Sequence, residues 1–459
     1  MVVSSSALPD ASTETSSMID LEAIHDFATD LAVRAGALLR QAAFSRSQAG
    51  YLPPPVASSS SSSSNDTSLS ETPDLDVRDK QSNVDIVTET DLRVEKFILE
   101  EIQKRYPGHA LLAEETYAAG GSKRFGLTDE ATWIVDPLDG TVNFLHLFPF
   151  VCVSIGFTIN KVPVVGAIYA PMLGGLDPRA SGGTLWSSCQ GRGAYQSYPS
   201  TTDSTQCSLA FLERYACSAM PRPQPVTSTT PAATTAGATT STTSTSADPS
   251  SSSSSSAAPQ PPGPQPLRLP LQPTRPLSRQ APSGLLIASE WGKDRRANPD
   301  GNLLRKANSF LNLAGEKGSR NGLGGQIQGL RSMGSAALDL AFCASGTIDV
   351  FWEGGCWEWD VCAGLAVLYE AGGIATEGNA PPPDLPLWDS KSGMRLPRPS
   401  LGARRFLCVR PCLVGSPAGE KGEEEETAVQ AQERVVRSIW QRLHLGGLAY
   451  QREGVEYAY

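Results

Sequence analysis

The segment from Thr132 to Phe144 constrains the fold most, because it combines a strand, a turn and a helix start. β-Branched and aromatic residues up to Val135 predict a short buried strand, and Pro137 with Gly140 predicts the tight turn that ends it. The helix that follows would begin at Gly140 with backbone N–H groups that lack an intrahelical partner and can bind an anion. The segment therefore predicts a strand, an anion-binding turn and a helix in direct succession.

Two aspartates, Asp136 and Asp139, lie within this turn. Their hard carboxylate oxygens suit Mg²⁺ or Mn²⁺, and Mg²⁺ usually binds through a few carboxylates together with a substrate phosphate. The same Asp-Pro-x-Asp-Gly pattern also occurs in ordinary turns, where the aspartates cap local backbone groups. This segment alone leaves both interpretations open.

Acids recur at the ends of three other predicted elements: Asp91 after a strand-like run, Glu114 after an apolar strand, and Asp360 at the start of an apolar helix. Each is individually also typical of a helix N-cap or a solvated strand end. If the fold gathers these acids around the turn, their like charges oppose simultaneous ionisation unless cations neutralise them. The pattern as a whole favours a metal centre.

These segments resemble the inositol monophosphatases, within the lithium-sensitive, Mg²⁺-dependent phosphatase superfamily. The resemblance rests on the following stretches: 85–91, 113–115, 133–144 with its continuation through 148–150 and 154–156, 331–337 and 359–364. It extends from an opening helix near Ile19 to a final helix at Glu433–Leu443. It implies hydrolysis of inositol monophosphate to myo-inositol and phosphate by a metal-activated water, in a lithium-sensitive enzyme of inositol metabolism and phosphatidylinositol signalling that forms a homodimer.

The resemblance also implies a role for individual residues, with two or three Mg²⁺ ions in each site. The implied metal ligands are Glu114, Asp136, the backbone carbonyl of Leu138, Asp139 and Asp360. The implied catalytic residues are Thr141, Asp91 and Glu114, of which the first two orient the attacking water. The implied substrate contacts are the amides of Gly140 and Thr141 for phosphate, and the Ala336 amide, Glu353 and Asp360 for the remainder of the ester. Lys80 matches a family lysine near the phosphate.

Two departures from the family pattern bear on this interpretation. Ala113 stands where the family often has glycine, and a methyl group there could crowd the backbone. The loop from Gly355 to Glu358 is bulkier and more acidic than is usual beside the substrate. Another small sugar, polyol or nucleotide phosphate therefore remains an alternative substrate, and a catalytically silent regulatory relative is the competing class of function.

Helical and strand patterns alternate along the chain, which predicts an α/β fold of alternating helix and sheet layers with disordered insertions. Serine runs and a Ser/Thr/Pro-rich stretch are too poor in large apolar residues to form a core. Shorter insertions are expected at 295–326 and 381–399. The predicted organisation is a disordered tail at 1–17, an N-terminal catalytic half at 18–200 with a Ser-rich insert at 45–75, a low-complexity insert at 201–282, a C-terminal half at 283–447 and a tail at 448–459.

Composition limits the partners of the chain. A formal net charge of -10 and the lack of a basic stripe argue against nucleic-acid binding. Nine cysteines without paired short spacing, and an N-terminus without a basic and apolar leader, favour a reducing, cytoplasmic location and no membrane contact. The expected partner is a small phosphorylated polyol substrate.

Overall fold

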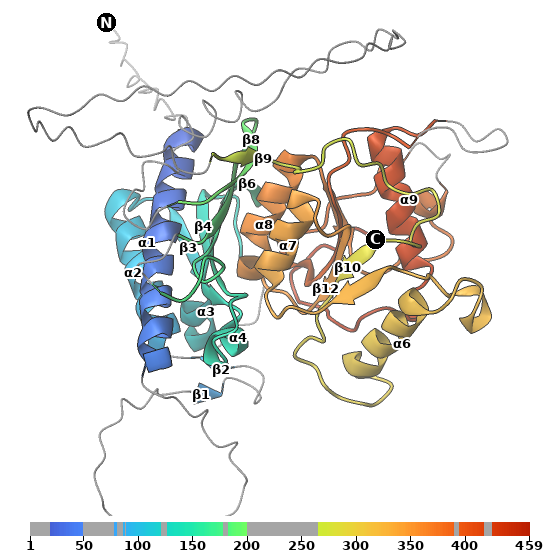
Figure 1. The fold of residues 1–459 in the computed structure, drawn as a ribbon, viewed down its shortest axis with the longest axis horizontal. Coiled ribbons are helices and arrows are strands. Elements are labelled where there is room, and N and C mark those ends of the chain that lie inside the picture. The colour runs from blue at the N-terminus through green and yellow to red at the C-terminus, as the bar shows by residue number, and fades with distance from the viewer. Residues whose placement is uncertain are drawn as a thin grey trace, which may run out of the picture.

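The computed structural model describes residues 19–48, 78–79, 86–87, 89–120, 126–177, 182–199, 265–389, 394–416 and 425–459. In this part of the chain, helices and sheets alternate in five layers, which run from left to right in Figure 1. The predicted layered α/β architecture is confirmed. The predicted tail at 1–17 and most of the two low-complexity inserts lie outside the described residues.

The first layer consists of α1 (Leu21–Gln48) and α2 (Glu89–Arg105). The apolar face predicted for the opening helix is buried, as Ile24, Leu31 and Leu39 show. Both helices pack on one face of the larger sheet. This layer forms because each helix has one apolar stripe that requires an apolar partner surface.

The second layer is a seven-stranded sheet with the order β3-β4-β5-β6-β7-β8-β9. The β3–β4 pair is parallel, whereas the other pairs are antiparallel. The short helices α3 (Glu114–Gly120) and α4 (Thr141–Leu145) follow β3 and β4 directly. The strands are β3 (Ala110–Ala113), β4 (Thr132–Asp139), β5 (Cys152–Ile159), β6 (Val162–Ala170), β7 (Thr184–Cys189), β8 (Gly193–Ser197) and β9 (Leu267–Arg268).

The middle layer consists of α7 (Ala336–Ser345) and α8 (Glu358–Ala371), which lie between the two sheets in Figure 1. Two glycines in the larger sheet allow α8 to approach closely. A Cβ at Gly156 would lie 2.5 Å from the Cys362 Sγ, and a Cβ at Gly166 would lie 2.3 Å from the Ala363 carbonyl oxygen. Because of this close approach, the first turn of α8 reaches the end of β4.

The fourth layer is a five-stranded mixed sheet with the order β11-β10-β12-β14-β13. Its strands are β10 (Leu286–Ala288), β11 (Gly329–Arg331), β12 (Val350–Gly354), β13 (Ile374–Glu377) and β14 (Arg405–Val409). The outer helices α6 (Asn302–Ala314) and α9 (Ala428–Trp440) cover it. The remaining elements are β1 (Arg78–Asp79), paired with β2 (Ile86–Val87), and the 3₁₀ turns η2 (Arg320–Gly322), η3 (Pro386–Trp388) and η4 (Leu401–Ala403).

Three sequence-based boundaries need correction. The end of the expected low-complexity insert is ordered, since β9 pairs with β8 and Leu269 and Leu277 are buried. The stretch interpreted as an insertion at 295–326 contains α6, which buries Leu313. The final helix begins earlier than predicted, because Thr427 forms a capping box with Gln430.

Two further observations concern covalent and membrane chemistry. The seven cysteines within the described residues are buried, and none of them forms a disulfide. Among the described helices, none combines the length and apolar composition needed to cross a bilayer.

Candidate metal-dependent active site

The site is built on the turn between β4 and α4, where the strand, turn and helix predicted from the sequence are all present. Asp136 is buried, and its Oδ1 accepts a hydrogen bond from the Leu138 amide at 3.0 Å. The register between β4 and β5 shifts between Asp136 and Asp139. Gly140 has φ +92°, and a Cβ there would lie 2.8 Å from the Phe150 carbonyl oxygen. This position therefore requires glycine on both conformational and steric grounds.

Three aspartates meet at this turn. Asp136 and Asp139 come from β4, and Asp360 comes from the first turn of α8. Each offers one carboxylate oxygen, and these oxygens all lie within 4.8 Å of one another. Segments more than two hundred residues apart in the chain thus form one oxygen-rich cluster of the kind that Mg²⁺ prefers.

The electrostatics of this cluster fit a divalent cation. Burial and the like charges of Asp139 and Glu114 raise the pKa of Asp360 to about 8, although the positive charge of Lys293 opposes the shift. Burial also raises the pKa of Asp139 to about 6 and that of Asp136 well above its ordinary value. Three carboxylates in this arrangement repel one another, and a bound cation would remove the repulsion.

Neighbouring donors fix the orientation of two of these carboxylates. The Oδ2 of Asp139 accepts hydrogen bonds from the Ser335 hydroxyl at 2.7 Å and the Ala337 amide at 2.8 Å. The Oδ2 of Asp360 accepts one from the Trp357 amide at 2.7 Å. Such outer contacts aim metal ligands and influence affinity strongly. Ser335, the N-cap of α7, has this role in addition to capping the helix.

Two further predicted ligands lie close by. Glu114 begins α3 and lines the same pocket, and its charge contributes to the raised pKa values of all three aspartates. The Leu138 carbonyl accepts a hydrogen bond from the Thr141 hydroxyl at 3.2 Å. Their roles as metal ligands remain predictions.

The pair predicted to orient the attacking water is also assembled. The Thr141 Oγ1 lies 3.3 Å from the Oδ1 of Asp91, a buried residue of α2. Because a hydroxyl has one proton, Thr141 can donate to either Asp91 or the Leu138 carbonyl at any moment. Its oxygen lone pairs remain able to accept a hydrogen bond from a water molecule.

The pocket above the cluster has a volume of about 290 Å³. It brings together the metal and substrate residues predicted from the sequence within the described part of the chain. Asp91 is not part of the lining but contacts Thr141, which is. The lining includes Glu114, Asp136, Leu138, Asp139, Gly140, Thr141, Ala336, Glu353 and Asp360. Lys80 lies outside the described residues. Ala113 is buried and does not have a positive φ, so its methyl group fits the backbone without strain.

Glu353 lines the pocket, and its carboxylate already has several partners. Its carboxylate forms a buried ion pair with Lys306 and accepts hydrogen bonds from the Glu290 amide at 2.6 Å and the Gly354 amide at 2.9 Å. A carboxylate has about four acceptor positions, so roughly one remains for a substrate hydroxyl. The predicted contact with substrate remains a prediction.

Several residues around the pocket are not evident from the sequence patterns. Glu290 accepts hydrogen bonds from the Met333 amide at 2.6 Å and the Ser332 hydroxyl at 2.7 Å, which fixes the segment before α7. The sequence did offer a signal for Glu290, because this acid stands two residues after the strand-like apolar run Leu285–Ala288. For Lys306, which is fully buried within α6, the sequence offers no such signal.

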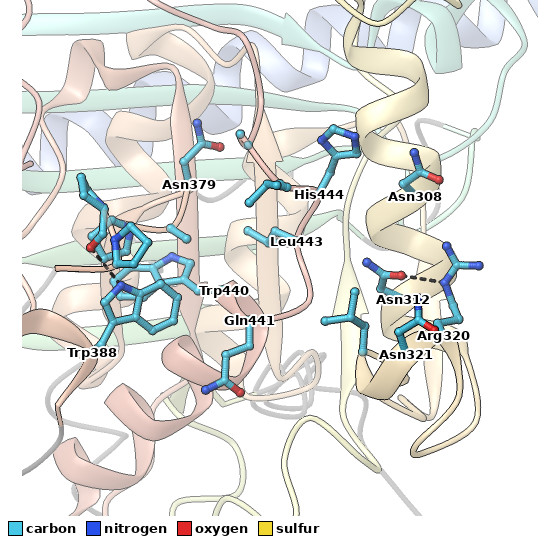
Figure 2. Close-up of a pocket in the computed structure, with 18 residues that line it drawn as sticks. Asn308, Asn312, Arg320, Asn321, Asn379, Trp388, Trp440, Gln441, Leu443 and His444 are labelled. Atoms are coloured by element: carbon cyan, nitrogen blue, oxygen red, sulfur yellow. Dashed lines mark hydrogen bonds between the residues drawn. The ribbon is translucent and has the colours of Figure 1, made fainter. Parts of the chain in front are cut away.

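A second, larger pocket of about 950 Å³ lies in the C-terminal half (Figure 2). Asn312 and Arg320 lie on one side of it, and Trp388 and Trp440 on the other. Its described lining contains no acidic residue. It therefore lacks the carboxylate oxygens that a Mg²⁺ site needs, and the smaller pocket is the candidate active site.

Comparison with known proteins gives a consistent result. The family model described as "Inositol monophosphatase family" matches residues 20–242 and 263–407. The chain is 38% identical over 435 residues to Protein qutG of Emericella nidulans, covering 94% of this chain and 96% of that protein. It is 38% identical over 446 residues to Quinic acid degradation cluster protein x of Neurospora crassa, covering 96% and 98%. It is 32% identical over 309 residues to Inositol monophosphatase 2 of Saccharomyces cerevisiae, covering 67% and 75%.

Proposed function

The chain belongs to the inositol monophosphatase family, and we propose that it is a Mg²⁺-dependent phosphatase that hydrolyses inositol monophosphate to myo-inositol and phosphate. The observation that carries this proposal is the cluster of Asp136, Asp139 and Asp360 beside the helix start at Gly140. The carboxylates provide hard oxygen ligands, and the helix start provides unpaired N–H groups for the phosphate oxygens.

In this proposal, the metal is held by Glu114, the three aspartates and the Leu138 carbonyl. When bound, Mg²⁺ neutralises charge on the phosphate and lowers the pKa of a bound water. The N–H groups of Gly140 and Thr141 hold the phosphate oxygens.

Thr141 and Asp91 orient the attacking water. The Thr141 hydroxyl donates to Asp91, so its oxygen lone pairs can accept a hydrogen bond from the water and point its reactive lone pair at phosphorus. Asp91 is held in place by its burial in α2. The homodimer and the cytoplasmic location implied by the family are part of the same proposal.

Release of phosphate from inositol 1-phosphate, measured with added Mg²⁺ and with chelator, tests this function directly. We expect turnover that requires Mg²⁺ and is inhibited by lithium. Undiminished turnover in chelator would refute the metal-dependent mechanism. A protein that binds Mg²⁺ but releases no phosphate from any ester would instead identify a catalytically silent relative.

A second candidate substrate is a polyol phosphate that also carries a carboxylate. Two cationic residues, Lys293 and Arg295, line the pocket together with Trp291. Two relatives that match almost the whole chain have names that refer to quinic acid degradation or to qutG, not to inositol. 3-Phosphoglycerate and glycerol 3-phosphate form a matched pair of esters that differ in one carboxylate. A higher kcat/KM for 3-phosphoglycerate, lost in Lys293→Ala, would favour the acidic substrate.

A further inference from the structure

The chain continues beyond α9 as a C-terminal tail, Leu448–Tyr459, which folds back onto the active site. The residues matched by the family model end at 407, so this tail lies outside them. It packs on the loop Gly355–Trp357, which joins β12 to α8. That loop connects Glu353, which lines the pocket, to Asp360 in the aspartate cluster.

The main contact between the tail and α8 is made by Arg452. Its guanidinium forms an ion pair with Glu358, the first residue of α8, and both side chains are almost completely buried. Its Nη2 donates a hydrogen bond to the Tyr117 hydroxyl at 2.7 Å, and its backbone amide donates one to the Tyr457 hydroxyl at 2.7 Å. Arg452 is therefore fixed at both its backbone and its side chain.

Two guanidinium groups contact the Trp357 ring. The Cζ of Arg404 lies 3.6 Å from the ring centroid, and the Cζ of Arg452 lies 4.8 Å from it. Trp357 also stacks on Trp359 with a centroid separation of 5.5 Å. The backbone amide of Trp357 donates the 2.7 Å hydrogen bond to Asp360. The tail thus reaches a carboxylate of the cluster through one intermediate residue.

The rest of the loop is held in the same way. Arg404 donates hydrogen bonds to the Cys356 carbonyl at 3.0 Å and the Gly355 carbonyl at 2.6 Å. The Tyr450 ring covers Gly355, where a Cβ would lie 3.1 Å from the ring. The tail itself is anchored at Ala449, whose amide donates to the Asn302 Oδ1 at 2.7 Å.

We propose that Arg452 is a positioning residue for the metal ligand Asp360, and that the C-terminal tail is therefore a working part of the active site. This inference rests on the proposed metal site. It also accounts for the unusual loop, because Trp357 and Glu358 face the tail and are not part of the pocket lining, whereas Gly355 and Cys356 line the pocket. Trp357 and Glu358, the bulky and acidic residues of this loop, contact Arg452, and neither lines the pocket in which a substrate would bind.

Binding of Mn²⁺, measured by titration calorimetry on the full chain, tests this inference. Arg452→Ala removes one of the contacts of Trp357 and the cationic partner of Glu358, so we expect the Kd for Mn²⁺ to rise about tenfold, the effect typical of losing an outer partner of a metal ligand. Arg410→Ala is the matched control, because Arg410 is a buried arginine paired with Asp349 before the start of β12. It should lower the Tm as well but leave the Kd unchanged.

A second variant keeps the test decisive if Arg452→Ala does not fold. Glu358→Gln with Arg452→Met removes both buried charges together, so no unpaired charge is left. We expect it to fold and still to bind Mn²⁺ about tenfold more weakly. An unchanged Kd in a folded variant would overturn the inference. Failure of the proposed function is a different result. A wild-type protein that binds Mn²⁺ but hydrolyses no ester would refute the function and leave the comparison of Mn²⁺ Kd values valid.

Discussion

Two groups of carboxylates in this protein differ in what neutralises their negative charge. Around the β4 turn, Asp136, Asp139 and Asp360 face one another. In the C-terminal half, several buried acids have a cationic side chain as partner, whereas the buried Asp339 has none among the ion pairs of the described residues and lies near other acids. The pairs include Asp349 with Arg410, Glu353 with Lys306, Glu358 with Arg452 and Glu377 with Arg405.

The clustered aspartates need a bound cation to neutralise them, whereas the paired acids are neutralised within the fold. Burial raises the pKa of the clustered aspartates and also of Glu353, Glu358 and Glu377, but an adjacent lysine or arginine opposes the shift for these three glutamates. In the aspartate cluster, neighbouring acids increase the shift. A buried carboxylate that faces other carboxylates is thus the stronger indication of a metal site.

Removing a carboxylate from the cluster should have the largest effect. Asp136→Asn removes a negative charge shared by the proposed metals, so phosphate release should fall by roughly 10³-fold or more, above the effect of losing an outer partner. Asp349→Asn is the control, because that acid has cationic partners, and it should alter stability but not Mn²⁺ affinity. Near-normal turnover of Asp136→Asn at saturating Mg²⁺ would refute the assignment of the aspartate cluster as the metal site.

Removing the cationic partner of a buried acid should instead lower stability. Lys306→Met leaves Glu353 buried without its cation, so the free energy of unfolding should fall by about 3–5 kcal/mol. Adding Glu353→Gln should recover most of that loss, because the buried charge is then absent. Denaturant unfolding measures both effects. Equal stability of Lys306→Met and the wild type would show that Glu353 does not depend on its partner.

Thr141→Ala tests the proposed role of Asp91, which contacts the Thr141 hydroxyl and is not a proposed metal ligand. Without the hydroxyl, the water has no fixed acceptor, so kcat should fall by roughly 10²-fold. Thr141→Ser keeps the hydroxyl and should retain most activity. Mn²⁺ affinity should be similar in both variants. A similar loss in the serine variant would point to the methyl group or the backbone instead.

The pH dependence of stability should reveal the cluster directly. The folded-state pKa values of Asp139, about 6, and Asp360, about 8, lie above the ordinary value, so the folded protein binds more protons than the unfolded chain. Their contribution to stability is complete below about pH 4 and is lost as pH rises through 6 and 8. In chelator, Tm should therefore fall across that range by several degrees, at about 2–4 °C for each kcal/mol.

Mg²⁺ supplies the control for the pH experiment. It binds the ionised carboxylates, so the Tm increase that it causes should grow from pH 6 to pH 8. A Mg²⁺ effect that is constant over this range would contradict the assignment of raised pKa values to the cluster.

The smallest effect on turnover is expected for Glu353→Gln, although the protein should also lose stability because Lys306 is then buried without its partner. The amide keeps the shape but weakens hydrogen bonds to substrate hydroxyls by about 1 kcal/mol, a roughly fivefold change in kcat/KM for some esters relative to others. Glu377→Gln, paired with Arg405 away from the pocket, should leave these ratios unchanged. An equal decrease in kcat/KM for all esters would instead indicate that Glu353 contributes to a step shared by every substrate.

Local patterns in the sequence were sufficient to predict the β4 turn, the opening helix and α8. Each depends on contacts between near neighbours, such as the apolar stripe of α1 or the turn at Pro137 and Gly140. The structured end of the low-complexity insert was missed, because its few leucines, among them Leu269 and Leu277, lie in a stretch rich in proline. Only their burial in the tertiary structure distinguishes them from a disordered segment.

The sequence by itself therefore determined the layered fold class and the acids available to a metal, since strand ends, helix starts and acid positions are local properties. The tertiary structure decided which acids meet and which are neutralised. Asp360 joins Asp136 because α8 packs against glycines of the larger sheet, and Glu358, two residues earlier, is instead paired with Arg452 of the tail. Charge compensation depends on distances across the fold, and the order of residues along the chain does not contain those distances.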